Sequence, residues 1–242
     1  AYLRMCGRFV GNFNTQDLFY EMNDAVSGAG FELELPDTDS ALLQNFNVAP
    51  TTAIPILRFF NGAVRLDVVR WGLLPIWSKD PSKGAQMINA RSETITEKPS
   101  FRGLVKGHRC IIPMTGFYEW ERSNPKVKIP YFVTRSDGHL MLGAGLWSES
   151  PIVEEERTCA LITRDSIGDL DFIHDRSPVE FHAQEALKWL SSSEPPLELF
   201  HPDHQPRFAT IRVSTRVNSV RNNDASLVLP DDEPIESNDL TL

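Results

Sequence analysis

The spacing of apolar and polar residues predicts many short strands and only two clear helices. Residues 13–22 are apolar at helical spacing and follow Asn12 or Asn14 as a possible cap, and residues 183–190 repeat that spacing. The other apolar runs are short and strand-like: 46–50, 53–59, 64–71, 87–91, 110–113, 117–120, 131–134, 140–147, 160–163 and 208–213. This pattern predicts one α+β domain with many hairpin strands.

Turn residues mark the connections between these strands. Asn61-Gly62 predicts a hairpin between the strands on either side of it, and Asp137-Gly138 predicts another. Thr115-Gly116 is expected to form a turn between strands 110–113 and 117–120. Pro50 and Pro55 punctuate the region near residue 50 into short extended pieces.

Composition places the chain among ordinary globular proteins. It has 242 residues, 41% hydrophobic and 24% charged, enough for one large domain or two small ones. No run approaches 18 apolar residues and no secretory pattern opens the chain, so we expect no membrane span. Three widely spaced cysteines predict no disulfide framework and favour a reducing cytoplasm. Cys110 and Cys159 lie in apolar runs, where we expect them to be buried and inert.

The net charge of −9 is unevenly distributed. Six acidic residues and no Lys or Arg lie within 222–242, which leaves −3 for residues 1–221. The acidic end predicts a mobile, solvated tail. Basic residues gather between 91 and 109, and such a cluster is either a solvated face or a patch for a polyanion. The total charge therefore does not exclude a nucleic-acid partner.

Cys6 is the most informative candidate for chemistry. It follows Met5, and residues 1–5 have the character of a leader or an added segment, or translation starts at Met5. Removal of these residues would leave Cys6 with a free α-amine beside its thiol. Such a 1,2-aminothiol condenses with an aldehyde, first to an imine and then to a five-membered thiazolidine. The α-amine titrates below a Lys amine, so more of it is nucleophilic at neutral pH. The alternative is an ordinary small hydrophobe near the chain start.

Three further segments carry candidate polar groups. Asn89 and Arg91 lie two residues apart, on the same side of an extended segment. Glu119 lies between large aromatic residues, whose burial of its carboxyl group would favour acid or base chemistry. His174 follows an apolar residue and suits proton transfer near pH 7. Each also has a purely structural interpretation.

Other catalytic signatures are weak or missing. His201-Pro202-Asp203-His204 has a spacing seen in metal sites, but two His in a loop are weak evidence. The sequence has no P-loop, no dinucleotide fingerprint and no Gly-x-Ser-x-Gly turn. We therefore expect no metal and no cofactor.

Taken together, ten short motifs resemble the SOS-response-associated peptidase (SRAP) domain family, the abasic-site-processing proteins. They occur in family order from residue 5 to about 224, and they are Met5-Cys6-Gly7-Arg8-Phe9, Asn47-Val48-Ala49-Pro50-Thr51, Trp71-Gly72-Leu73-Leu74-Pro75-Ile76-Trp77, Asn89-Ala90-Arg91-Ser92-Glu93-Thr94, Glu97-Lys98-Pro99-Ser100-Phe101, Arg109-Cys110-Ile111-Ile112-Pro113, Gly116-Phe117-Tyr118-Glu119-Trp120, Ala144-Gly145-Leu146-Trp147, His174-Asp175-Arg176 and Val217-Asn218-Ser219.

The resemblance implies a fold and an activity. The fold is a single α+β domain with a bifurcated, partly barrel-like, mostly antiparallel sheet flanked by helices. The implied domain covers residues 6–224, between a leader at 1–5 and an acidic tail at 225–242. The implied activity is covalent capture of abasic sites in single-stranded DNA, which protects damaged DNA. The ring-opened sugar of such a site presents an aldehyde, the electrophile that a 1,2-aminothiol prefers.

The resemblance also assigns roles by position. Cys6 would supply both nucleophiles, Asn89 would orient the amine or the opened sugar, Glu119 would shuttle protons, and His174 would act as a second acid or base and help to reverse the cross-link. The positions implied to contact DNA are Arg8, Pro50, Trp71, Trp77, Arg91, Trp120 and Arg176. The three arginines would hold phosphates. The tryptophans would form apolar walls, and an exposed one could stack on a base.

One departure from the family and two alternatives remain. The family continues His-x-Arg-Met-Pro, whereas this chain has Ser177 before Pro178, which leaves the pocket wall there open. Cys6, His174 and Glu119 could instead form a cysteine peptidase that processes its own leader. A third possibility is a passive single-stranded DNA-binding module with no covalent step. We expect a monomer in each case.

Overall fold

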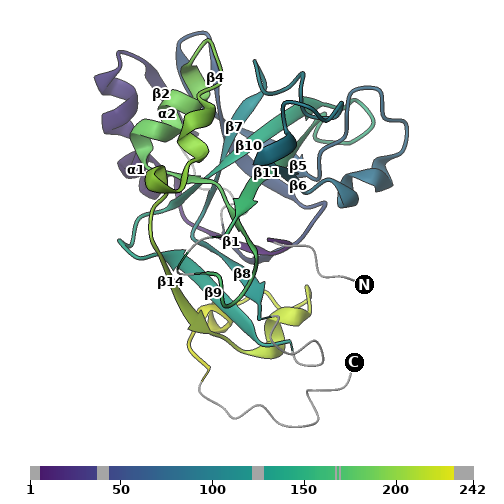
Figure 1. Ribbon diagram of the computed structural model, residues 1–242, viewed down its shortest axis with the longest axis vertical. Coiled ribbons are helices and arrows are strands. Elements are labelled where there is room, and N and C mark those ends of the chain that lie inside the picture. Colours follow the sequence, from purple (N-terminus) through teal and green to yellow (C-terminus); the bar gives the residue numbers. More distant parts are fainter. Residues whose placement is uncertain (1–5, 37–43, 122–127, 167, 169, 232–242) are drawn as a thin grey trace.

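The strands form two sheets that share one α+β unit (Figure 1). The computed structural model describes residues 6–36, 44–121, 128–166, 168 and 170–231. The smaller sheet has the order β14-β9-β8-β1-β3, with β1 (Phe9–Asn12), β3 (Gln44–Val48), β8 (Gly116–Trp120), β9 (Pro130–Arg135) and β14 (Phe208–Arg212). All of its pairings are antiparallel.

The larger sheet curls into a partly closed ring. Its main path is β12-β11-β10-β7-β4-β5-β2, and β11 also pairs with β5, which closes the ring. Its strands are β2 (Glu32–Glu34), β4 (Ala53–Phe60), β5 (Ala63–Trp71), β6 (Asn89–Arg91), β7 (Arg109–Met114), β10 (Met141–Glu149), β11 (Arg157–Asp165), β12 (Arg176–Pro178) and β13 (Glu180–Phe181). The predicted α+β fold with a bifurcated, partly barrel-like sheet is confirmed.

Two α-helices lie where the pattern predicts them. Helix α1 (Thr15–Gly28) begins at the Asn14 cap, whose side chain accepts from the Asp17 amide while the Asp17 side chain accepts from the Asn14 amide. It runs six residues beyond the predicted end. Helix α2 (Ala183–Ser191) matches the prediction within one residue. Its apolar stripe packs on β4, β7 and β10.

The Asn61-Gly62 hairpin is confirmed between β4 and β5. Both turn residues have positive φ, 50° and 81°, which suits a two-residue hairpin loop. Pro55, in contrast, does not interrupt its strand, because β4 continues through it opposite Val68.

The Asp137-Gly138 hairpin prediction is wrong. Strands β9 and β10 flank this turn but belong to different sheets, since β9 pairs with β8 and β14 whereas β10 pairs with β7, β11 and β13. Arg135 donates to both carboxylate oxygens of Asp137 and to the Phe181 carbonyl, which fixes the crossing.

The chain changes sheet at Thr115 as well. Strands β7 and β8 flank it, yet they do not pair with each other. A Cβ at Gly116 would lie 2.4 Å from the carbonyl oxygen of Val133 in β9, so only glycine fits at this start of β8, against the neighbouring strand of the same sheet. These two crossings produce the bifurcation.

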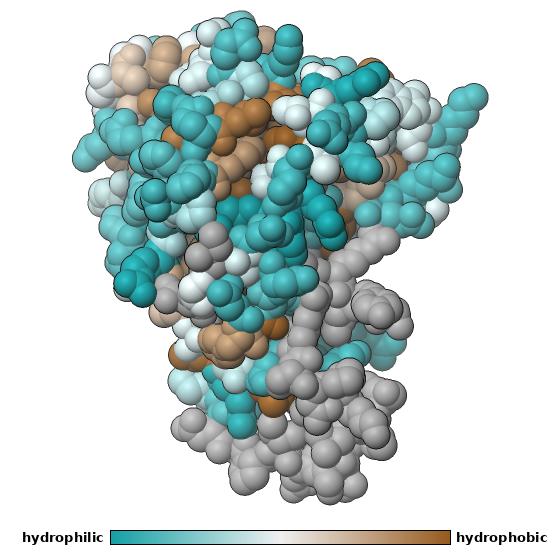
Figure 2. All heavy atoms as spheres, in the orientation of Figure 1, coloured by the Kyte–Doolittle hydropathy of each residue, from teal (hydrophilic) through white to brown (hydrophobic). Residues whose placement is uncertain are grey.

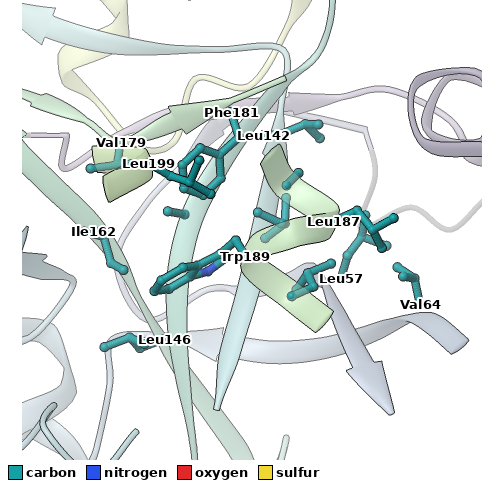
Figure 3. Close-up of a cluster of buried hydrophobic side chains, with 14 of the residues drawn as sticks. Leu57, Val64, Leu142, Leu146, Ile162, Val179, Phe181, Leu187, Trp189 and Leu199 are labelled. Carbon is teal, nitrogen blue, oxygen red and sulfur yellow. The ribbon is translucent and has the colours of Figure 1, made fainter. Parts of the chain in front are cut away.

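Two large apolar clusters occupy opposite faces of the curled sheet. The helix-side cluster lies under α1 and α2, and in Figure 3 the Trp189 ring lies among Leu146, Ile162 and Phe181. The second cluster, which we call the inner cluster, includes Cys6, Phe9, Trp71, Cys110 and Cys159. A smaller third cluster lies on the other face of the five-stranded sheet. Figure 2 shows hydrophilic side chains over much of the upper part of one face.

The packed fold extends beyond the expected boundary at residue 224. Asp224 caps a 3-10 helix at Ala225–Val228, and Leu227 is fully buried. Pro230 forms a bridge with Val213 of the third cluster. Residues 225–230 are therefore packed in the structure, and residues 232–242 lie outside the described part. The expected leader at residues 1–5 also lies outside it.

Across the described ranges, no helix is both long and apolar enough to cross a membrane.

Candidate functional site

The backbone nitrogen of Cys6 is held by a carboxylate. Its N–H donates to Oε2 of Glu119 over 2.9 Å, and the Cys6 residue is only 2% exposed. Strand β1 pairs with β8 through Phe9 and Phe117, and continuing that antiparallel register brings the start of the chain beside Glu119. Cys6 has a φ of 44°, an uncommon value for a residue with a side chain.

Glu119 is a buried acceptor for two backbone amides. It shares a face of β8 with Phe117, which belongs to the inner cluster, while Tyr118 and Trp120 point to the opposite face. Oε1 of Glu119 accepts from the Trp120 amide over 3.2 Å, and Oε2 accepts from Cys6. The alternation of side chains along β8 therefore places this carboxylate in the interior, where it contacts the Cys6 nitrogen.

The surroundings of the Cys6 thiol favour its protonated form. Burial raises its pKa well above the ordinary value, and the charges of Glu119 and Glu180 raise it further. Arg176 acts in the opposite direction. The thiol is therefore neutral at physiological pH in this structure.

His174 is buried at the edge of this region. Its Nδ1 lies 2.9 Å from the Arg176 amide nitrogen and 2.8 Å from a carboxylate oxygen of Asp175. The first contact requires a lone pair on Nδ1 and the second requires a proton, so they are satisfied in different protonation states. In either protonation state one of the two contacts at Nδ1 holds the ring in the same orientation.

Arg176 is tied to acidic partners on the same face. Its guanidinium donates to both oxygens of Glu93, over 2.7 and 2.9 Å, and also to Asp165 and the Thr163 carbonyl. Burial lowers the pKa of Arg176, but these acidic partners raise it overall. Because Arg176 contacts Thr163, the neighbouring Ser177 points to the opposite face of β12, away from the inner cluster.

Strand β6 presents Asn89 and Arg91 beside β11. The two strands are parallel, with Asn89 opposite Leu161 and Arg91 opposite Thr163. Leu161 belongs to the inner cluster and Thr163 contacts Arg176, so both β6 side chains project on the face that carries Cys6. Asn89 is half-buried and Arg91 is exposed.

The remaining sequence-predicted positions differ in exposure. Arg8 donates to Oδ1 of Asn47 and to the Val217 carbonyl, and it lies on the opposite face of β1 from Phe9. Pro50 is half-buried after β3. Trp77 is 63% exposed and presents its ring to solvent.

Trp71 and Trp120 have no such free face. Trp71 is fully buried and donates to the Ile88 carbonyl, and its ring meets Phe9 edge-on. Trp120 is nearly buried and donates to Oδ1 of Asn218. Both rings are packed in the interior, Trp71 in the inner cluster and Trp120 in the third cluster, and Trp77 is the member of the three that offers a surface for stacking.

The other sulfur and histidine candidates lie elsewhere. Cys110 and Cys159 are buried free thiols, and burial raises the pKa of each. His201 pairs with Asp203 at the surface. Within the described ranges, no three His, Cys, Asp or Glu side chains are grouped so that they could hold a metal ion. Arg109, one of the basic candidates, donates to carbonyls of Val105 and Trp189 and so has a structural role.

Sequence reasoning missed Glu180. It lies between Val179 and Phe181, and an alternating pattern of this kind indicates a strand with its polar residue facing water. The structure buries Glu180 completely. No local signal reveals this, because the burial comes from the pairing of β13 with β10, far away in the sequence.

Comparison with known proteins gives a consistent result. The sequence pattern of the SOS response associated peptidase (SRAP) family matches residues 5–220. The chain is 36% identical to abasic site processing protein YoqW of Bacillus subtilis, over 93% of this chain and 99% of that one. It is 33% identical to abasic site processing protein HMCES of Xenopus tropicalis, over 77% and 66% respectively. A crystal structure of a Bacteroides thetaiotaomicron protein shares the fold, with a TM-score of 0.72, 24% identity, and coverage of 93% of this chain and all of that one.

Proposed function

The chain belongs to the SRAP family, among the abasic site processing proteins, and from this premise we propose that it captures abasic sites in single-stranded DNA covalently through Cys6. The product is a thiazolidine between the deoxyribose aldehyde and the 1,2-aminothiol of an N-terminal Cys6. Capture of this kind shields the damaged strand from other reactions.

One observation carries this proposal: the nitrogen of Cys6, and not only its sulfur, has a dedicated buried partner. Glu119 reaches that nitrogen at 2.9 Å from a strand 113 positions further along the chain. A peptidase that used the thiol alone would have no use for a carboxylate at the nitrogen. A mechanism in which the nitrogen attacks an aldehyde needs a group there to accept its proton.

The chemistry balances without a cofactor. The neutral amine attacks the aldehyde carbon of the opened sugar, and the resulting hydroxyl leaves as water after receiving a proton, which gives an iminium. The Cys6 sulfur then attacks the iminium carbon as the thiol loses its proton to a base in the pocket. One C–N and one C–S bond form, and one water is released. Glu119 accepts and returns protons at the nitrogen.

Other residues fit supporting roles in this scheme. Asn89 orients the opened sugar from the adjacent strand β6, and His174 serves as a second acid or base, including in reversal of the cross-link. Arg8, Arg91 and Arg176 hold phosphates that flank the site. For Arg176 this requires that phosphate compete with Glu93 and Asp165. Pro50 and Trp71 form the wall of the site, and Trp120 packs behind it on the opposite face of β8.

The proposal requires a free amine on Cys6. An amide nitrogen cannot form an imine, so residues 1–5 must be absent from the active form. Peptidase chemistry enters this proposal at one step, the removal of any attached residues by the protein itself. The Cys6 thiol is not ionised at rest and so does not supply a thiolate for peptide cleavage, because burial and the carboxyl groups of Glu119 and Glu180 raise its pKa.

The test is the intact mass of protein that begins at Cys6 after mixing with single-stranded DNA containing one abasic site. We expect a shift equal to the DNA strand minus one water, which survives denaturation. Cys6→Ser and a chain that retains residues 1–5 serve as matched controls, since each removes one nucleophile, and neither should show the shift.

Two other outcomes would support a different function for this protein. Cleavage of peptides by the chain with residues 1–5 attached, lost in Cys6→Ser, would support the peptidase. Binding that is unchanged in Cys6→Ser, leaves no stable adduct and weakens steeply with salt would support a passive DNA-binding module. If the terminal amine is confirmed to be free and no adduct forms, the proposal of covalent capture is wrong.

A further inference from the structure

Glu180 is a second buried carboxyl group on the face that carries Cys6. It lies in β13 opposite Gly143 of β10. A Cβ on Gly143 would point at Leu161 and Met114, both members of the inner cluster that contains Cys6. Directly paired residues of antiparallel strands project to the same face, so the Glu180 side chain enters this cluster as well.

The surroundings of Glu180 do not supply a direct counter-ion. The residue is 0% exposed, and neither carboxyl oxygen accepts a hydrogen bond of ordinary geometry from the described residues, although the Leu142 amide lies close enough to favour the ionised form. Arg135 is the nearby cation, but its guanidinium is committed to Asp137, His182 and the Phe181 carbonyl. An ionised carboxylate in this position would be desolvated and unpaired.

The charge state of Glu180 affects the pKa of the Cys6 thiol. Burial raises the pKa of Glu180 to about 8, with Arg135 and the Leu142 amide opposing the rise. The group is therefore mostly neutral at pH 7 and mostly anionic only above about pH 8. Its negative charge is one of the causes that raise the pKa of the Cys6 thiol, beside that of Glu119.

We propose that Glu180 is a charge-setting residue of the Cys6 site, which must carry its proton for covalent capture to proceed. This inference rests on the proposed function and adds a second carboxyl group with a different task. Glu119 contacts the reacting nitrogen, whereas Glu180 acts through the thiol and is a positioning residue. When the Cys6 sulfur attacks the iminium carbon, its S–H proton leaves and negative charge develops on sulfur. Neutral Glu180 tolerates that charge, and ionised Glu180 opposes it.

The charged and titratable groups around this site act in known directions. Glu119 and an ionised Glu180 both disfavour the thiolate, while Arg176 favours it. Arg135 favours ionisation of Glu180. His174 lies two residues before Arg176 and accepts a hydrogen bond from its amide at Nδ1. Of the groups whose pKa is described here, Glu180 is the one that changes charge between pH 7 and 9.

The experiment measures the rate of adduct formation between about pH 6 and pH 9 for wild type and Glu180→Gln, both beginning at Cys6. Taking the ratio of the two rates cancels the titration of the amine and of other shared groups. A carboxyl group with a pKa of about 8 is about one-tenth protonated one unit higher, so we expect the ratio of variant to wild type to rise about tenfold by pH 9. A ratio that stays flat with pH overturns the proposal.

Controls separate this inference from folding and from the proposed function. Glu198→Gln alters an exposed carboxylate, and its ratio to wild type should not change with pH. Glu180→Leu, which also carries no charge, replaces the Gln variant if that variant does not fold. If wild type forms no adduct at any pH, the proposed function fails, and alkylation of Cys6 by iodoacetamide over the same pH range decides the role of Glu180. Faster alkylation in Glu180→Gln only above about pH 8 supports it, and a constant ratio refutes it.

Discussion

The two faces of the curled sheet differ in the side chains that they bury: one face buries mainly apolar groups, and the other also buries ionisable groups. The helix-side cluster is built from aliphatic and aromatic side chains around Trp189, covered by α1 and α2 (Figure 3). The inner cluster has the same depth of burial, yet the face it occupies also carries Cys6, Glu119 and Glu180. Strand β13 shows the contrast within two residues, since Phe181 enters the helix-side cluster and Glu180 the other face.

This difference separates stability from reactivity. The helix-side face buries apolar area with few polar atoms, and the hydrogen bond from the Trp189 indole to the Cys110 carbonyl satisfies one of those atoms. The inner face buries ionisable groups, which costs free energy and raises the pKa of the Cys6 thiol and of the Glu180 carboxyl group. The comparison therefore predicts that substitutions on one face alter folding and those on the other alter capture.

The largest effect should come from Glu119→Gln. The amide can no longer take a proton from the Cys6 nitrogen, so we expect single-turnover capture to slow by about 10²- to 10⁴-fold. Quenched time courses with abasic single-stranded DNA measure this. Glu121→Gln, two residues along the chain, is the matched control and should retain the wild-type rate. A Glu119→Gln rate within about twofold of wild type would remove Glu119 from the chemistry.

Trp189→Ala tests the helix-side face. Loss of this fully buried ring should lower the free energy of unfolding by about 3–5 kcal/mol, measured by denaturant titration. Capture well below the unfolding transition should keep the wild-type rate, because the ring lies on the face opposite Cys6. Lys188→Ala alters the exposed neighbour and should change stability by less than about 0.5 kcal/mol. A slowing of capture like that of Glu119→Gln would mean that the faces are not independent.

Glu180 should make the stability of the wild type depend on pH. Its pKa rises from 4.5 to about 8 on folding, so the folded state holds more protons between those values and stability falls as pH rises through this window. Each unit corresponds to about 1.4 kcal/mol, so the loss amounts to a few kcal/mol. Denaturant unfolding near pH 5 and near pH 8 measures it, and Glu180→Gln should lose less. Equal pH slopes for the two proteins would show that Glu180 ionises normally.

The smallest effect is expected at the exposed surface, from Trp77→Ala. Loss of an exposed stacking surface should weaken binding of single-stranded DNA by about 1–3 kcal/mol, measured by fluorescence anisotropy. The capture rate at saturating DNA should stay unchanged, since the ring does not reach the buried groups. Ile76→Ala removes an equally exposed apolar neighbour without a π face and serves as the control. Identical losses in the two variants would indicate general apolar contact instead of stacking.

Local pattern predicted the elements but not their partners. The Asn61-Gly62 hairpin and both helices follow from turn chemistry and periodicity, which act over a few residues. The Asp137-Gly138 turn carries the same local signal, yet β9 finds its partners in β8 and β14. Strand pairing is decided by contacts far apart in sequence, and a turn signal does not contain them.

The candidate site shows the same limit. Cys6 and Glu119 stand out by residue type and motif, and the structure brings them into contact. The burial of Glu180 follows from the pairing of β13 with β10, which turns its side chain toward the inner cluster, and no property of residues 178–181 predicts that pairing. A polar residue in an alternating strand points to water only when one face of the sheet is open.

The hydrogen bond from Cys6 to Glu119 also sets an order in time. The two residues are 113 positions apart, so a growing chain carries Cys6 long before its partner exists. During synthesis an aminothiol at the start of the chain would be open to any small aldehyde. A segment that still covers the Cys6 nitrogen until β8 has folded would keep it from reacting too early. Comparison of aldehyde labelling at Cys6 in stalled nascent chains shorter and longer than residue 120 measures this protection directly.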